Sequence, residues 1–239
     1  MRVTGAKKNP NLTNVSDAPE AVVINNPTGQ KPRIHNVFIV DASGSMAGSK
    51  YANAIGGVNE LLKSIATDTD TDNNAMIVEF EGNKIVTRLA LGDTIPETYQ
   101  GMGTGGMTPL NQAIGETLET VLKTRKKQYN VADKVLVSIF TDGEENSSRG
   151  KYATADVLRD FIKKLEGEGF TITFIGTQDE VQYAINTLAM QASNTLVHTN
   201  TAASVKRSFD TTLKARKAYS KSVAKGEDVT AQFYTKSLD

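Results

Sequence analysis

Two hydrophobic patterns alternate along this chain from residue 36 onward, and their alternation restricts the possible folds more than any other feature. A continuous apolar run at residues 37–40 and a run at 135–140 that is apolar except for Ser138 are typical of strands that are covered on both faces. Between such runs, apolar residues recur at steps of three and four, as from Tyr51 to Ile65, which places them on one face of a helix. The alternation predicts an α/β domain built around a mostly parallel sheet.

The same patterns locate the individual elements. Strands are expected at residues 37–40, 75–80, 85–89, 135–140, 170–175 and 195–198, and helices at 51–65, 110–121, 158–165, 181–188 and from 205 onward. Gly82 and Asn83 join the second and third strands, which indicates a tight antiparallel hairpin. Right-handed crossovers between the other strands place helices on both faces. The expected fold is therefore a doubly wound, Rossmann-like, mostly parallel six-stranded sheet with one antiparallel edge hairpin.

The ends of the chain differ in composition from its middle. Four of the six prolines lie in the first 32 residues, and proline is excluded from helix interiors and central strands. We therefore expect residues 1–33 to form a Pro-rich arm, with one short edge strand at 21–24, residues 34–220 to form the α/β domain, and residues 221–239 to form a C-terminal tail.

Composition excludes several classes of function. Lys plus Arg and Asp plus Glu are 27 each, so the net charge of zero argues against a nucleic-acid partner bound through bulk charge. The 239 residues include no cysteine and two histidines, which excludes disulfides and thiolate chemistry and disfavours a His-based metal site. No apolar run approaches the ~20 residues of a membrane helix, and the first residues lack the apolar segment of a signal peptide. We expect a cytoplasmic protein with no membrane partner.

Oxygen-bearing side chains are concentrated in three loops that the fold should bring together. The candidate site residues are Asp41, Ser43, Ser45, Thr108 and Asp142. Ligand sites in doubly wound sheets lie outside the carboxyl ends of the strands. Asp41 directly follows one buried strand, and Asp142 lies two residues after the end of another. Thr108 precedes a predicted helix, where it suits the N-cap while Pro109 suits the first helical position.

The donor types in these loops favour a hard divalent cation. Carboxylates and hydroxyls suit Mg²⁺ or Mn²⁺ better than Zn²⁺ or Cu²⁺. Two carboxylates balance the charge of such an ion, whereas the hydroxyls contribute dipoles without charge. A carboxylate from outside, the Asp or Glu of a partner protein, could then complete the coordination shell.

Three segments resemble the metal-ion-dependent adhesion site of von Willebrand factor type A (VWA) domains. They are Asp41-Ala42-Ser43-Gly44-Ser45, the Gly-Gly-x-Thr-Pro-Leu sequence around Thr108, and Thr141-Asp142-Gly143. The resemblance covers about residues 34–220. It implies a metal-dependent protein-interaction module that is not an enzyme, with the five candidate residues as metal ligands. Residues 141–148 and 170–176 are also similar to a stand-alone intracellular branch of the family found in bacteria and their phages.

Two other functions fit parts of the sequence. A Mg²⁺-dependent phosphatase of the haloacid type also places its metal at a strand end, but it needs an acid two residues after its nucleophilic Asp, where this chain has Ser43. A structural component of a phage particle or larger assembly could use the arm and the tail as straps between subunits. In that case the protein would reside in the virion or the host cytoplasm.

Two charged segments are given simpler interpretations. Residues 68–72 hold alternating aspartates like the start of a calcium loop, but Asn73 replaces the expected glycine, so a solvated acidic linker is preferred. Basic residues of the last helix fall on one face, which we expect to be solvated, although an acidic partner, nucleic acid included, would fit them. They are Arg207, Lys214, Lys217, Lys221 and Lys225.

Overall fold

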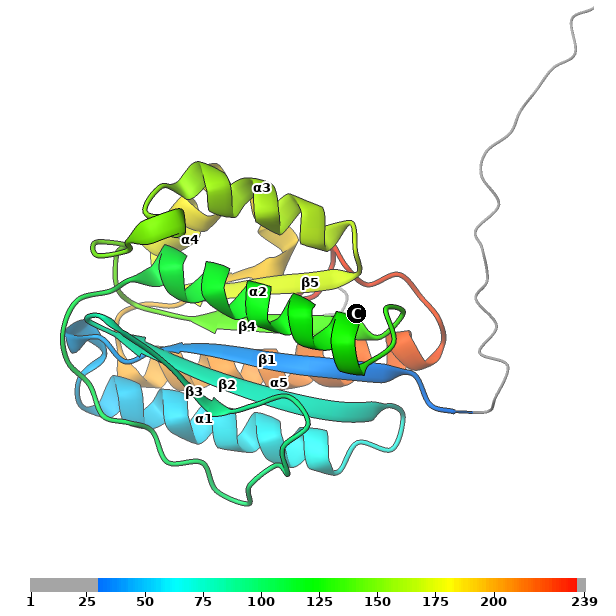
Figure 1. Cartoon of the computed structure of the whole chain (residues 1–239). Coiled ribbons are helices and arrows are strands. Elements are labelled where there is room, and N and C mark those ends of the chain that lie inside the picture. The colour runs from blue at the N-terminus through cyan, green and yellow to red at the C-terminus, as the bar shows by residue number, and fades with distance from the viewer. Residues whose placement is uncertain (1–29, 236–239) are drawn as a thin grey trace, which may run out of the picture.

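The apolar runs of the sequence become the strands of one mixed sheet in the computed structural model, which describes residues 30–235 (Figure 1). The strands are β1 (Arg33–Asp41), β2 (Asp72–Glu81), β3 (Lys84–Leu89), β4 (Lys134–Phe140), β5 (Phe170–Gly176) and β6 (Thr195–Val197). Their spatial order is β3-β2-β1-β4-β5-β6, and all neighbours are parallel except the β2–β3 hairpin. The predicted fold class is confirmed, whereas the strand expected at 21–24 lies outside the described residues.

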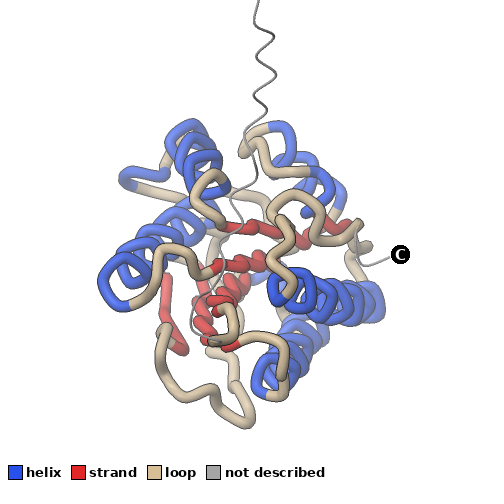
Figure 2. Tube along the Cα trace, turned by 90° about the vertical axis from the view of Figure 1, so that its right-hand side faces the viewer, coloured by secondary structure: helices blue, strands red, loops and turns tan. Residues whose placement is uncertain are grey.

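Helices cover both faces of the sheet, as predicted. They are α1 (Ser49–Ala66), α2 (Leu110–Gln128), α3 (Ala155–Glu166), α4 (Gln178–Asn186) and α5 (Ala202–Ala224). Along β1, Val37 and Ile39 pack into the apolar cluster formed with α2, α3 and α4, whereas Phe38 and Val40 pack into the cluster formed with α1 and α5. Figure 2 shows the strands between these two groups of helices. Burial on both faces explains why the central strands are continuous apolar runs.

The register of the two central strands determines where the candidate site lies. The neighbours β1 and β4 are parallel, and Val40 pairs with Phe140. Asp41 therefore ends its strand beside Thr141, and Asp142 follows one residue later. The two strands that precede the aspartates are thus neighbours in the sheet, and both deliver their loops to the same edge.

The C-terminal region packs against the domain. The boundary expected at residue 220 falls inside α5, which continues to Ala224. Beyond the helix, Val229, Phe233 and Tyr234 are buried in the apolar cluster of α1 and α5. The ring centroid of Phe233 lies 5.8 Å from that of Tyr219. Residues 221–234 are thus a continuation of the packed domain and not a separate tail.

A buried ion pair fastens α5 to the connection between α1 and β2. Arg216 Nη2 lies 2.9 Å from Asp68 Oδ2, and the two side chains are 2% and 6% exposed. Asn73 Oδ1 accepts a hydrogen bond of 2.7 Å from the same nitrogen, and Ser220 Oγ donates to Asp68 over 2.5 Å. The expectation of a solvated acidic linker was therefore wrong at Asp68, because a cation far along the chain takes the place of water.

The five basic residues predicted to share one face of the last helix are solvent-exposed, as expected. They are Arg207, Lys214, Lys217, Lys221 and Lys225. Among the described residues, no helix combines the length and the hydropathy needed to cross a membrane.

Candidate functional site

Asp41 is a fully buried carboxylate at the end of β1. Its Oδ1 accepts a hydrogen bond of 2.7 Å from the backbone N–H of Ser43, and its Oδ2 accepts one of 2.6 Å from Thr141 Oγ1. Burial raises the pKa of Asp41 to about 6, the hydrogen bonds oppose the rise, and the charge of nearby Asp142 adds to it. The carboxylate is thus held in one orientation in surroundings that favour a neighbouring cation.

Oxygens from three loops converge around Gly143. A Cβ atom placed on this glycine would lie 2.8 Å from Thr108 Oγ1, 3.0 Å from Ser45 Oγ and 3.2 Å from Asp41 Oδ2. Ser43 joins the group because its Oγ lies 3.0 Å from that of Ser45. Four of the five predicted site residues therefore face a common small space, which stays open because residue 143 has no side chain.

Asp142 supplies the second carboxylate of the site. Its side chain is fully buried, and Lys50 Nζ donates a hydrogen bond to Oδ2. The other oxygen, Oδ1, is buried without a hydrogen-bond partner within the described part of the chain. A buried polar atom without a partner costs free energy, and a cation beside it would remove that cost. The five residues therefore fit a divalent cation.

The donor set also indicates which kind of cation fits. Residues 30–235 contain no group of three or more His, Cys, Asp or Glu side chains arranged to hold a metal. A metal here must rely on two carboxylates supplemented by hydroxyls, a purely oxygen set that suits Mg²⁺ and Mn²⁺.

The loop after β4 forms hydrogen bonds both with Thr108 and with the first turn of α2. The N–H of Thr108 donates to Asn146 Oδ1 over 2.8 Å, and the N–H of Asn146 donates back to the Thr108 carbonyl over 3.2 Å. Glu145 Oε2 accepts a hydrogen bond of 2.7 Å from the N–H of Asn111 in the first turn of α2. The loops that carry Thr108 and Asp142 are thereby locked together.

This arrangement corrects the prediction that Thr108 caps α2. The helix begins at Leu110, Pro109 occupies the N-cap position, and no side chain at that position makes a capping hydrogen bond. Glu145 provides the cap from another loop, which leaves the hydroxyl of Thr108 free to face Gly143. A carboxylate at a helix N-terminus also interacts favourably with the helix dipole.

Two residues at the site were not predicted from the sequence as participants. Thr141 orients Asp41, and Lys50 contacts Asp142. Thr141 was visible only as part of the Thr-Asp-Gly motif. The one signal for Lys50 was its position directly before the helix predicted at residues 51–65, where a positive charge opposes the helix dipole.

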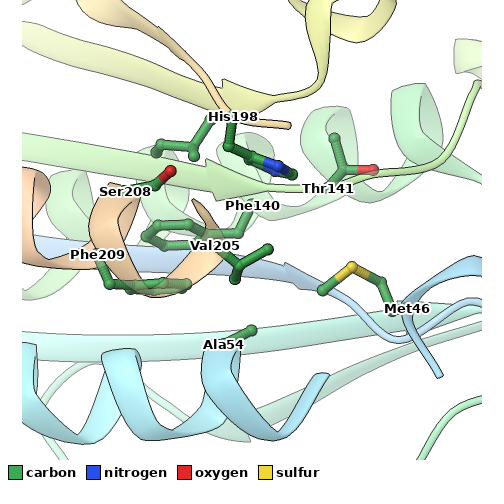
Figure 3. Close-up of a pocket in the computed structure, with 9 residues that line it drawn as sticks. Met46, Ala54, Phe140, Thr141, His198, Val205, Ser208 and Phe209 are labelled. Carbon is green, nitrogen blue, oxygen red and sulfur yellow. The ribbon is translucent and has the colours of Figure 1, made fainter. Parts of the chain in front are cut away.

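An apolar floor lies beneath the site, between α1 and α5. Figure 3 shows Met46 extending toward Val205, with Thr141 at the edge of the small cavity that these residues line. The rings of Phe140 and Phe209 stack there at 4.3 Å between centroids. Thr141, which donates a hydrogen bond to Asp41, therefore connects the site to this apolar cluster.

The fold and the site together define the class of protein. The protein is an α/β domain with a doubly wound sheet. At the carboxyl edge of the sheet, three loops present carboxylates and hydroxyls that form a candidate oxygen-ligated metal site. Residues 37–212 match the model of the von Willebrand factor type A domain, and the chain belongs to this family.

Part of the chain is similar to a protein of known identity. The chain is 27% identical over 135 residues to the magnesium-chelatase 67 kDa subunit of Chlorobaculum tepidum, a match that covers 55% of this chain and 21% of the relative. The chain thus spans about a fifth of the length of that protein.

Solved structures share the fold. Proximal thread matrix protein 1 from the mussel byssus superposes with a TM-score of 0.58 at 18% identity, covering 76% of this chain and 47% of that one. Another structure of that protein is described as having a zinc-occupied MIDAS motif. The pilus adhesin SpaC from Lactobacillus rhamnosus GG gives a TM-score of 0.57 at 13% identity, covering 80% of this chain and 30% of that one.

Proposed function

We propose that this chain is a protein-binding module in which a divalent cation, Mg²⁺ or Mn²⁺, links the carboxyl edge of the sheet to an acidic side chain of a partner. The residues that would hold the cation are Asp41, Ser43, Ser45, Thr108 and Asp142. The proposal is carried by the convergence of oxygens of Asp41, Ser45 and Thr108 around Gly143, the residue that follows Asp142. When bound, the cation would supply a Lewis-acidic position that a carboxylate oxygen of a partner Asp or Glu can occupy.

The surface around the site suits a protein partner. Ser45 and Gly106 are exposed on the rim, and Met107 exposes 54% of its surface beside buried Thr108. An exposed methionine at the rim can pack against varied apolar side chains. A partner that covers this rim would exclude water from the carboxylate contact and strengthen it.

The proposed role is not enzymatic. The position that a haloacid-type phosphatase needs for its acid is occupied by Ser43, whose Oγ contacts Ser45. The magnesium-chelatase relatives share only a small part of their length with this chain, so their activity is not transferred to it. Hydrolysis of p-nitrophenyl phosphate that disappears in Asp41→Asn would contradict this part of the proposal.

The first test measures the metal directly. Saturating Mg²⁺ or Mn²⁺ should raise the melting temperature of the wild-type protein because an ion bound only by the native state stabilises it. Asp142→Asn, which keeps an oxygen to accept the Lys50 hydrogen bond, and Ser45→Ala should both reduce the rise. If neither ion changes the melting temperature and calorimetry detects no heat, the proposal is wrong.

The second test measures the partner. Binding of a partner should be lost in chelator and in Asp142→Asn, because both remove the cation that contacts the acidic side chain. Charge reversal at Lys217 and Lys221, on the exposed face of α5, provides a matched control and should leave binding intact. Binding that ignores chelator but is lost on charge reversal would instead identify α5 as the working surface.

A further inference from the structure

Lys50 occupies one side of the candidate metal site. Its side chain is 18% exposed, and its Nζ donates hydrogen bonds to Asp142 Oδ2 and, over 2.9 Å, to Asn200 Oδ1. The second carboxylate oxygen of Asp142 has no hydrogen-bond partner among residues 30–235. The buried carboxylate of Asp142 therefore contacts Lys50 through one oxygen, and its other oxygen can contact a bound ion.

The position of Lys50 is not explained by the helix that carries it. Lys50 is the second residue of α1, where the helix dipole makes a positive charge unfavourable. The first turn of α1 contains no acidic residue, and Gly48 at its N-cap provides no side-chain hydrogen bond. The compensating negative charge comes from Asp142, in the loop after β4. The charge of Lys50 is therefore stabilised by the candidate site and not by α1.

We infer that Lys50 sets the charge of the metal site so that a bound divalent cation requires an anionic ligand. This inference rests on the proposed function and concerns the chemistry of the partner. The formal charges of Asp41, Asp142 and Lys50 sum to −1. A divalent cation changes the sum to +1, and one carboxylate from a partner returns it to zero.

Two consequences follow from this charge count. Repulsion between the ammonium group and the cation weakens metal binding in the absence of a partner, and it is appreciable because the site is largely buried. A carboxylate is attracted by both positive groups, so the cation and the carboxylate strengthen each other's binding by the same factor. An uncharged ligand, such as an amide or a hydroxyl, receives no such gain. The surface therefore selects partners that present Asp or Glu over partners that present Asn or Ser.

The test uses Mg²⁺ and acetate as probes of the full-length protein. Calorimetry gives the Mg²⁺ dissociation constant in chloride and in acetate at equal ionic strength, for wild type and for Lys50→Gln, which keeps hydrogen-bonding capacity without the charge. We expect Lys50→Gln to bind Mg²⁺ about tenfold more tightly in chloride, a modest change for removal of a neighbouring charge. We also expect acetate to tighten Mg²⁺ binding clearly in wild type and much less in the variant. Lys63→Gln, at an exposed position of the same helix, is the control and should behave as wild type.

Each outcome decides the question. If Lys50→Gln binds Mg²⁺ no more tightly than wild type, or if acetate helps both proteins equally, the inference is overturned while the metal site stands. If wild type binds no Mg²⁺ under any condition, the proposed function itself fails. Lys50→Met serves as a second neutral variant should the glutamine variant not fold. A wild-type protein whose Mg²⁺ affinity is the same in acetate and in chloride contradicts the inference without any variant.

Discussion

Replacing Gly143 with alanine tests the candidate site at its geometric centre. The added methyl carbon would lie 2.8 Å from Thr108 Oγ1 and 3.0 Å from Ser45 Oγ, closer than such atoms pack without something shifting. Gly143 does not adopt the left-handed backbone conformation that favours glycine, so alanine introduces no backbone strain. The substitution therefore fills the space among the oxygens while leaving all five proposed ligands in the sequence.

The expected size of the effect follows from linkage. Mg²⁺ at a hundred times its dissociation constant stabilises a native state that alone binds it by about 2.7 kcal/mol. For a domain of this size, 1 kcal/mol changes the melting temperature by about 2–4 °C, so wild type should gain about 5–11 °C. Gly143→Ala should lose most of this gain. Overpacking should also lower the free energy of unfolding of the metal-free variant by about 1–3 kcal/mol.

Thermal unfolding followed by circular dichroism, with and without Mg²⁺, measures both effects. Gly56→Ala is the matched control, because a Cβ at this position in α1 meets no atom within 4 Å. That variant should gain about 0.5–1 kcal/mol in the helix and keep the full response to Mg²⁺. A Gly143→Ala protein that responds to Mg²⁺ as wild type does would refute the assignment of the space around residue 143 to the cation.

Three further predictions concern the rest of the domain. Asp68→Asn should cost about 3–5 kcal/mol in urea unfolding, because it leaves the buried Arg216 without its counter-charge, whereas exposed Asp72→Asn should change little. Burial by itself would raise the pKa of Asp68, but hydrogen bonds and Arg216 hold it below its usual value. The contribution of ionised Asp68 to the free energy of unfolding is therefore present above about pH 4 and is lost as the pH falls through the lower folded-state pKa. The stability of Asp68→Asn should lack this part of the pH dependence. Glu145→Ala should cost about 1–2 kcal/mol by uncapping α2 and should weaken Mg²⁺ binding in calorimetry; unchanged affinity would show that the cap does not position the site. Removal of residues 1–18 should preserve cooperative unfolding, because all the strands that the structure describes in residues 30–235 lie between residues 33 and 197.

Local patterns in the sequence were sufficient to predict the elements of the fold. Unbroken apolar runs occur where a strand is covered on both faces, and β1 and β4 are buried in this way. Apolar steps of three and four predicted α1 because that spacing follows from helix geometry. The hairpin through Gly82 was also predicted, and the glycine has the positive φ of 55° that its turn requires.

Predicting the candidate site needed one rule beyond local patterns. Asp41 and Asp142 were recognisable because each lies within two residues of the end of a buried apolar run, and parallel strands of one sheet end at a common edge. The sequence did not show how closely the oxygens approach. That depends on the register of β1 against β4 and on the contact of Thr108 with Asn146, which join segments far apart in the chain.

Contacts between polar groups that are far apart in the sequence could be found only in the tertiary structure. Periodicity reports which face of an element is buried, but it carries no information about which polar group from another element will meet that face. The ion pairs of Arg216 with Asp68 and of Lys50 with Asp142 join segments far apart in the chain that no local pattern connects. The cap of α2 likewise came from Glu145 and not from its own neighbour in sequence. The sequence by itself determined the sheet, the helices and the loops that carry the candidate ligands, because these follow from local geometry and burial. The tertiary structure determined which charges are paired, because pairing depends on distances that exist only after the chain has folded.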